Sequence, residues 1–181
     1  MNIFVLDRNP IKAAQMMCDA HVVKMIVESC QLLSTNDRLH CRFADSSGLY
    51  KSTHVSHPCR IYLASEYNRA WLICHLSALL VEYTHRFGKV HKSAELYHRY
   101  YYSEVFKPEI QDIFVRASSW SKFILPKCMP DEFKDGDDSI DSVVLSYRKY
   151  YRHKQRTMKR FRYTNRDIPN WLKGSNYEQS L

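Results

Sequence analysis

Apolar residues recur at helical spacing along most of the chain. In the first such stretch, the apolar face of a helical wheel consists of Val22, Val23, Ile26, Val27, Cys30 and Leu33. Asn9 followed by Pro10 is typical of a helix start, because Asn caps free N–H groups and Pro fits the first turn. We therefore predict a helix from Ile11 to about Ser34, preceded by a short strand or an extended arm over Asn2–Leu6.

Two more helices are predicted in the middle of the chain. Pro58 opens an apolar stretch that runs to about Phe87 and stops at Gly88, the residue type favoured after a helix C-terminus. A Tyr-rich helix starts near Ser93 and ends before Pro108. The polar stretch 36–57 is predicted to be a loop, and 109–125 is compatible with a short helix followed by an extended piece.

The last predicted helix follows a loop at 126–130 and an acidic turn at 131–138. Ser139 can cap this helix, which is predicted to reach about Lys159. The chain has only 4 Gly and 6 Pro, which argues against a turn-rich all-β fold, and its 181 residues fit one domain. The predicted fold is therefore mainly α, a compact single-domain helical bundle over 1–181 with a short N-terminal arm and irregular loops.

Charge adds a candidate partner to this picture. The chain has 27 Lys and Arg against 19 Asp and Glu, a balance that favours polyanions. Nine of the cations and no acid lie between Arg148 and Arg166, interleaved with Tyr and Phe. Cations neutralise phosphates and aromatic rings stack on exposed bases. The segment 147–171 is therefore predicted to bind DNA, either single-stranded or damaged duplex, through Arg148, Lys149, Arg152, Lys154, Arg156, Lys159, Arg160 and Trp171. The alternative is a solvated basic helix whose tyrosines face the core.

The start of the second predicted helix offers two further chemistries. His57 and Arg60 lie where free N–H groups attract anions, so we predict a phosphate contact there, with simple helix capping as the alternative. His54 and His57 have a spacing that can hold zinc, and Cys59 is nearby. No second Cys or carboxylate completes a familiar ligand set. We therefore expect no bound metal and no cofactor.

The cysteines and the apolar stretches bear on the compartment. None of the six cysteines forms a C-x-x-C pair, and several lie among apolar residues, which is typical of buried free thiols. No signal peptide is recognisable, and the longest apolar stretch, 70–81, is far short of the ~20 residues needed to span a bilayer. We expect a soluble, cytoplasmic protein without a membrane partner. The sequence leaves the oligomeric state open.

A polar group on the first predicted helix is the candidate catalytic site. His21, Lys24 and Glu28 follow one stripe, while Asp19 projects into the apolar face. A His, a Lys and a Glu together can form an acid–base site or activate a lysine nucleophile. An Asp on an apolar face needs a partner. The alternative is a solvent-facing Lys24–Glu28 pair and a structural Asp19.

The order of several motifs resembles that of a family of small phage proteins. The matching segments are Met1–Asp7, Ala13–Gln15, Cys18–Met25, Thr53–Pro58, Met129–Asp131, Tyr147–Tyr151 and Pro169–Trp171. The chain also resembles, more distantly, the phage pyrimidine-dimer DNA glycosylases of the endonuclease V type. That resemblance rests on the N-terminal arm, on a central helix from His57 to Gly88 and on the Pro-x-Trp end.

The resemblance implies an all-α protein that extrudes a nucleotide, cleaves a glycosidic bond and then cuts the backbone through an imine. Those enzymes use the amine of an N-terminal Thr exposed by Met removal, whereas the bulk of Asn2 should retain Met1 here. The imine would then need the Met1 amine or Lys24. The family's catalytic carboxylate in the first helix could be Asp19 or Glu28.

Three functions follow from these observations. The first is a DNA glycosylase/lyase, with Lys24 as nucleophile and His21 as acid–base group. The second is a DNA endonuclease that hydrolyses phosphodiesters with His21 as general base. The third is a non-enzymatic nucleic-acid-binding protein that blocks a host defence factor. Metal dependence separates the first two.

Overall fold

The structure is a computed structural model that describes residues 1–105, 107 and 122–173. Within these residues all regular secondary structure is helical, which confirms the predicted mainly α fold. The elements are α1 (Pro10–Gln15), α2 (Asp19–Leu39), α3 (Pro58–Ile61), η1 (Tyr62–Ala64), α4 (Glu66–Phe87), α5 (Ala94–Tyr100), α6 (Tyr102–Val105), η3 (Asp131–Phe133), α8 (Ile140–Thr157) and η4 (Asn170–Leu172).

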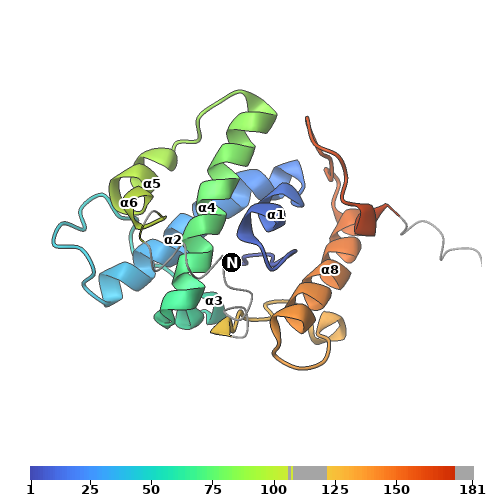
Figure 1. The fold of residues 1–181 in the computed structure, drawn as a ribbon, viewed down its shortest axis with the longest axis horizontal. Helices are drawn as coiled ribbons and strands as arrows, with labels where there is room; N and C mark the ends of the chain where they lie inside the picture. The colour runs from blue at the N-terminus through green and yellow to red at the C-terminus, as the bar shows by residue number, and fades with distance from the viewer. Residues whose placement is uncertain (106, 108–121, 174–181) are drawn as a thin grey trace, which may run out of the picture.

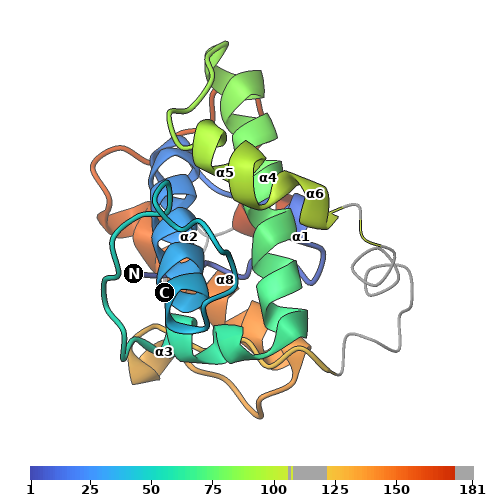
Figure 2. The same ribbon diagram turned by 90° about the vertical axis from the view of Figure 1, so that its left-hand side faces the viewer.

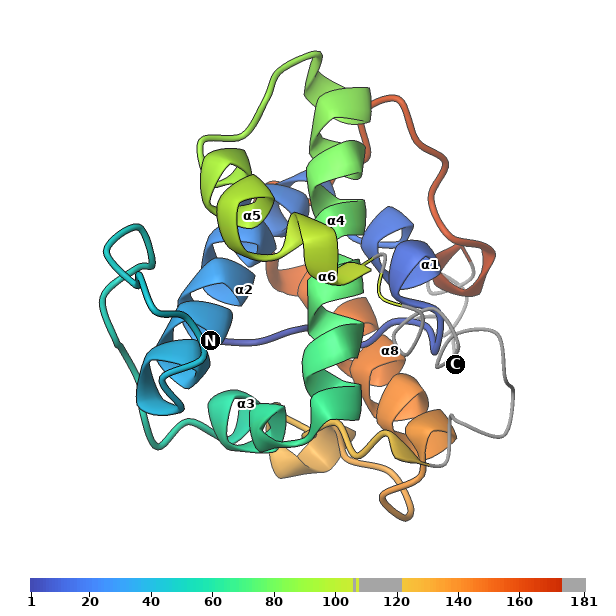
Figure 3. The ribbon, with the colours of Figure 1, turned by 60° about the vertical axis from the view of Figure 1, so that its left-hand side comes forward.

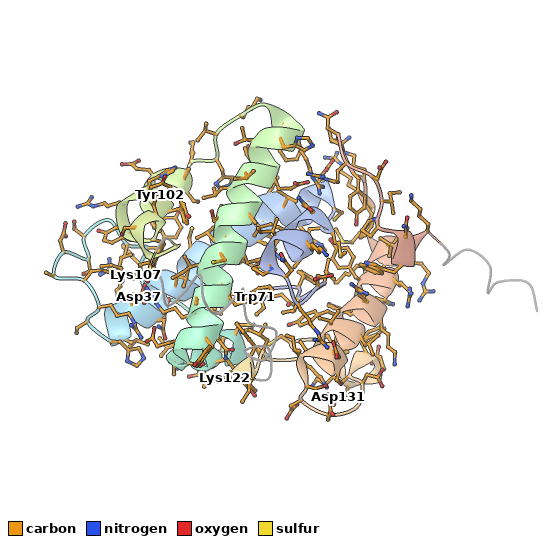
Figure 4. The ribbon with its side chains drawn as sticks, viewed as in Figure 1. Asp37, Trp71, Tyr102, Lys107, Lys122 and Asp131 are labelled. Atoms are coloured by element: carbon orange, nitrogen blue, oxygen red, sulfur yellow. The ribbon has the colours of Figure 1, made fainter. Side chains whose placement is uncertain are left out.

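The long helix α4 runs through the middle of the molecule, and both α1 and α2 pack against it (Figure 1). Helices α5 and α6 lie over one side of α4, and α8 lies across the molecule from them (Figure 2). Trp71 lies in the second turn of α4 (Figure 4), fully buried, with its ring stacked on His75 and its Nε1–H donating to Arg8 O over 2.8 Å. This central packing fixes α4 as the support for the elements around it. Among the described residues, no helix is both long and apolar enough to cross a membrane.

The first six residues form an extended arm rather than a strand. The arm crosses the molecule behind α4, from the side of α2 toward α8 (Figure 3). Ile3, Phe4, Val5 and Leu6 are all buried. The Asn2 side chain turns the arm by accepting hydrogen bonds from the backbone N–H groups of Ile3 and Phe4, and Arg148 of α8 donates to Leu6 O over 2.8 Å. The arm is therefore part of the core.

The predicted first helix is wrong in its continuity, because it is two helices separated at 16–18. Asn9 caps α1 as predicted, and Pro10 is its first residue. At the break, the Tyr151 hydroxyl accepts from Cys18 N over 2.7 Å and the Tyr163 hydroxyl donates to Met16 O over 2.8 Å. These distant tyrosines satisfy the backbone groups that a continuous helix would have paired internally.

Other boundaries also differ from the prediction. α2 continues to Leu39, five residues beyond the predicted end, because the polar residue Asp37 in its last turns is buried against Arg69 of α4. The second predicted helix breaks at Ser65, whose ψ of 125° is extended. Gly88, with a φ of 63°, ends α4 as expected.

The remaining elements follow the prediction in part. The Tyr-rich helix is split into α5 and α6. Ser139 caps α8 by accepting from Ser142 N, and α8 ends at Thr157, close to the predicted Lys159. The ambiguous stretch 109–125 lies outside the described residues except for 122–125. The cysteines are free thiols as expected, although Cys41 is exposed and Cys74 and Cys128 are only half-buried.

Candidate active site

Glu28 lies where the N-terminal arm meets α2. Glu28 is 9% exposed, and its carboxylate oxygen Oε2 accepts a hydrogen bond from Asn2 N over 2.8 Å. The other oxygen, Oε1, lies 3.2 Å from Lys24 Nζ, one helical turn earlier. Because Met1 precedes Asn2 directly, its α-amine is held within a few ångströms of the same carboxylate. One buried carboxylate thus pairs with the Lys24 amine and binds the residue that follows the Met1 amine.

Asp19, the other candidate carboxylate, is part of a buried ion-pair cluster. Its oxygens accept from Arg86 Nη1 over 3.0 Å and from the Thr164 hydroxyl over 2.7 Å. Arg86 is also bonded to Glu82, which in turn pairs with Arg166. Burial alone would raise the pKa of Asp19, but the hydrogen bonds from Thr164 and Arg86 outweigh it and lower that pKa. These contacts are the ones that the alternative interpretation, a structural Asp19 bonded to a neighbouring helix, leads one to expect.

His21, on the stripe that it shares with Lys24 and Glu28, is turned into the core. Its ring is buried, stacked on Phe4 with 4.4 Å between centroids, and its Nδ1 lies 2.8 Å from the Tyr151 hydroxyl. Burial, together with the positive charges of Lys24 and Lys154, lowers the pKa of His21 to about 4. A neutral ring packed in this way positions the arm against α2 and α8. The structure therefore brings Lys24 and Glu28 together, whereas His21 packs against Phe4 and Tyr151 in the core.

His57 and Arg60 lie at the start of α3. His57 Nδ1 caps α3 by accepting from Cys59 N over 3.2 Å, as the capping alternative predicts, while Arg60 Nε donates to Val55 O over 2.6 Å. Burial lowers the pKa of His57, and the nearby N-terminal ammonium adds to this effect.

Several of the predicted DNA-binding cations are already engaged within the fold. Arg148 bonds Leu6 O, Lys149 pairs with Asp135 over 2.7 Å, and Arg152 donates to Trp171 O over 2.9 Å. The tyrosines Tyr147 and Tyr151 face the core, as the alternative interpretation of this segment predicted. The segment is therefore partly a structural element.

The remaining cations lie toward the C-terminal end of α8. Lys154 lies over the Tyr150 ring at 4.9 Å and is close enough to His21 to affect its protonation. Arg156, Lys159 and Arg160 are exposed. These four side chains form the part of the predicted DNA surface that is free to meet a ligand, and we call them the α8 basic end.

Trp171 is half-buried rather than free to stack on a base. Arg148 lies over its ring at 5.2 Å and Arg152 at 5.9 Å, while its indole N–H points at Met16 Sδ. A ring with cations on its face has less surface left for a nucleobase. Trp171 instead anchors the C-terminal segment to α8.

Two contributors to this site were absent from the sequence prediction. Asn2 joins Glu28 to the rest of the arm, and its Nδ2 donates to Cys128 O over 2.8 Å. Cys128 in turn lies against Cys59, with 3.2 Å between the sulfurs. No local signal marks these residues, since each contact joins segments far apart in the sequence.

Comparison with known proteins adds one finding. A sequence model of the family described as pyrimidine dimer DNA glycosylase matches residues 1–96, which include the arm, α1 to α4 and the start of α5. No curated protein and no solved structure gives a significant match. The matched part contains Lys24, Glu28 and His57, whereas α8 lies outside it.

Proposed function

The chain belongs to the pyrimidine dimer DNA glycosylase family, and from that premise we propose that it is a DNA glycosylase with an accompanying lyase activity on damaged DNA. The observation that carries this proposal is the hydrogen bond from Asn2 N to the Glu28 carboxylate. It holds the residue that follows the Met1 α-amine against a buried carboxylate, and an amine beside a carboxylate is the pair that imine-forming glycosylase chemistry uses.

The proposed reaction begins with extrusion of the damaged nucleotide, which costs about a few kcal/mol of unstacking. An uncharged amine attacks the sugar carbon C1′, and the bond from C1′ to the base breaks, with the base taking the electron pair and then a proton. The positive charge that develops on the sugar is stabilised by the Glu28 carboxylate. The sugar ring opens to give an imine, loss of a C2′ proton follows, and the bond from C3′ to its phosphate oxygen breaks.

The attacking amine is either the Met1 α-amine or Lys24 Nζ. In general an α-amine titrates near 8 and a lysine near 10.4, so a far larger fraction of α-amines is uncharged at neutral pH. Lys24 has an exposed side chain paired with Glu28, a geometry suited to a phosphate of the bound strand. We therefore assign the attack to the Met1 amine, with Lys24 as a DNA contact. Asp19 and His21 are assigned positioning roles, which hold α2 and the arm.

The α8 basic end would bind the DNA backbone beside the site. The positive charges of Lys154 on α8 and Lys24 on α2 both act on His21, whose ring packs on Phe4 of the arm. Such a distribution attracts a polyanion across the arm, where the proposed nucleophile begins the chain.

Borohydride trapping tests the proposal directly. The protein is mixed with labelled duplexes that carry a cyclobutane pyrimidine dimer, an abasic site or no lesion. Reduction should then fix a covalent complex on the two damaged duplexes only. Mass spectrometry of the digested complex locates the linked amine, and Lys24→Ala is compared with Lys12→Ala, an exposed lysine on α1.

An adduct on the Met1 peptide that survives Lys24→Ala and disappears on N-terminal acetylation supports the assignment as made. An adduct on Lys24 retains the lyase but overturns the choice of amine. DNA cutting that EDTA abolishes, without any adduct, overturns the proposal in favour of a hydrolytic endonuclease. Salt-sensitive binding with neither cutting nor adduct overturns it in favour of a non-enzymatic DNA-binding protein.

A further inference from the structure

A cluster of metal-ligating side chains adjoins the proposed active site and has no part in its chemistry. His57 and Cys59 come from the start of α3, and Cys128 comes from the segment before η3. One ligand atom from each residue lies within 4.8 Å of the other two. Cys59 is buried and the other two are half-buried, so the three groups face one another at the edge of the core.

We propose that His57, Cys59 and Cys128 bind a zinc ion. Two thiolates and one imidazole form a ligand set that zinc prefers, and they leave one of its four tetrahedral positions open. This inference concerns a different chemistry from the proposed glycosylase reaction and does not depend on it.

The distance between the two sulfurs favours metal binding over a disulfide. They lie 3.2 Å apart. Zinc bound tetrahedrally at about 2.3 Å from each sulfur would separate them by about 3.8 Å, whereas a disulfide needs about 2.05 Å. The observed spacing is nearer to the first value, and a small rotation of one half-buried side chain, that of Cys128, covers the difference.

The surroundings suit a cation bound by thiolates and place it next to the arm. Asn2 Nδ2 donates to the backbone oxygen of Cys128, while Asn2 N donates to Glu28. The ion would therefore tie Cys128 to α3, and through Asn2 it would hold the arm against Glu28. A hydrogen bond to the segment that carries a metal ligand is a common way to orient such a site.

Zinc analysis of the DNA-free protein tests this proposal independently of any glycosylase activity. Protein purified under reducing conditions and dialysed should retain about one zinc ion per chain, as a structural or catalytic single-metal site would. Cys128→Ser is expected to bring the content close to zero, and Cys41→Ser, which changes an exposed cysteine outside the cluster, is expected to leave it unchanged. Circular dichroism checks that both variants are folded.

Cobalt gives a second readout that does not depend on the native metal. Titration of apo-protein with Co²⁺ should produce a thiolate-to-cobalt charge-transfer band and intense visible bands typical of tetrahedral sites, both lost in Cys128→Ser and in His57→Ala. No metal retained and no such bands in the wild-type protein would overturn the proposal. A Cys59–Cys128 disulfide in mass spectra of the freshly isolated protein would also overturn it, in favour of a redox-active pair.

Discussion

Replacing Glu28 by Gln and Asp19 by Asn separates the two carboxylates that the sequence left equivalent. In Glu28→Gln, the amide oxygen can still accept the bond from Asn2 N, and the loss is the pair with Lys24, whose side chain is 66% exposed. An exposed pair contributes about 0–1 kcal/mol, so the free energy of unfolding should hardly change. The rate should fall by about 10²–10³-fold, the usual loss when one group that stabilises the charge of the transition state is removed.

The matched variant, Asp19→Asn, should behave in the opposite way. Arg86 is fully buried, and its pair with Asp19 is reinforced by Thr164. Removing the charge of one partner of a buried pair costs about 3–5 kcal/mol. We expect about 3 kcal/mol, because Asn keeps part of the hydrogen bonding, and this loss corresponds to a decrease in Tm of about 6–12 °C for a chain of this length. The kcat of the folded variant at low temperature should stay within about 5-fold of wild type, or ~1 kcal/mol.

The assay is single-turnover cleavage of a dimer-containing duplex, paired with thermal unfolding followed by circular dichroism. Both variants are measured well below their melting temperatures, so that the rates report folded protein. If Glu28→Gln retains more than about a tenth of the wild-type rate, or if Asp19→Asn loses more activity than Glu28→Gln, then the assignment of the chemistry to Glu28 is refuted.

Two further predictions concern pH and salt. Burial lowers the pKa of His21 to about 4 and that of His75 to about 3. Since both values lie below the ~6.5 of an unfolded histidine, their contribution to stability is complete above pH ~6.5 and is lost as the pH falls toward the folded values. The free energy of unfolding of the wild-type protein should therefore fall between pH ~6.5 and ~5. In His75→Phe this fall should be smaller by up to about 2 kcal/mol, as measured by urea titrations at the two pH values. An equal fall in the free energy of unfolding in His75→Phe and in the wild-type protein would contradict this. In DNA binding, Arg156→Gln and Arg160→Gln should each reduce the slope of log K against log salt by about 0.9 on duplex DNA. Lys12→Gln on α1 should not change that slope, and an equal reduction by Lys12→Gln would mean that the α8 basic end is no specific contact surface.

Local signals predicted the helix ends correctly wherever the residues that decide them are neighbours in sequence. Asn9 and Ser139 cap their helices through bonds two or three residues away, and Gly88 ends α4 by its own positive φ. The breaks at 16–18 and at Ser65 were not predicted. The first is stabilised by hydroxyls of Tyr151 and Tyr163, more than a hundred residues along the chain, and no periodicity within one helix reports such partners.

The same limit applies to the candidate site. The sequence singled out the stripe on the first helix, and both Lys24 and Glu28 lie at the arm. It could not rank Asp19 against Glu28, because their partners, Arg86 and Asn2, lie 67 and 26 residues away. Zinc was not expected for a similar reason, since the second cysteine of the cluster lies 69 residues from the first.

The buried arm connects the proposed chemistry to the proposed DNA surface. Phe4 has a φ of 45°, a left-handed conformation that costs a bulky residue free energy and persists only where the surroundings impose it. Those surroundings are His21 of α2, stacked on the Phe4 ring, and Tyr147 and Tyr151 of α8, which meet it edge-on. The helix whose basic end would bind DNA therefore also sets the path of the arm that carries the amine. A shift of α8 on a bent duplex would be transmitted through Phe4 to Asn2 and Glu28. If the Met1 amine is the nucleophile, as proposed, residues outside the matched part of the chain would set its position, and Tyr147 and Tyr151 would support the reaction by packing on the arm.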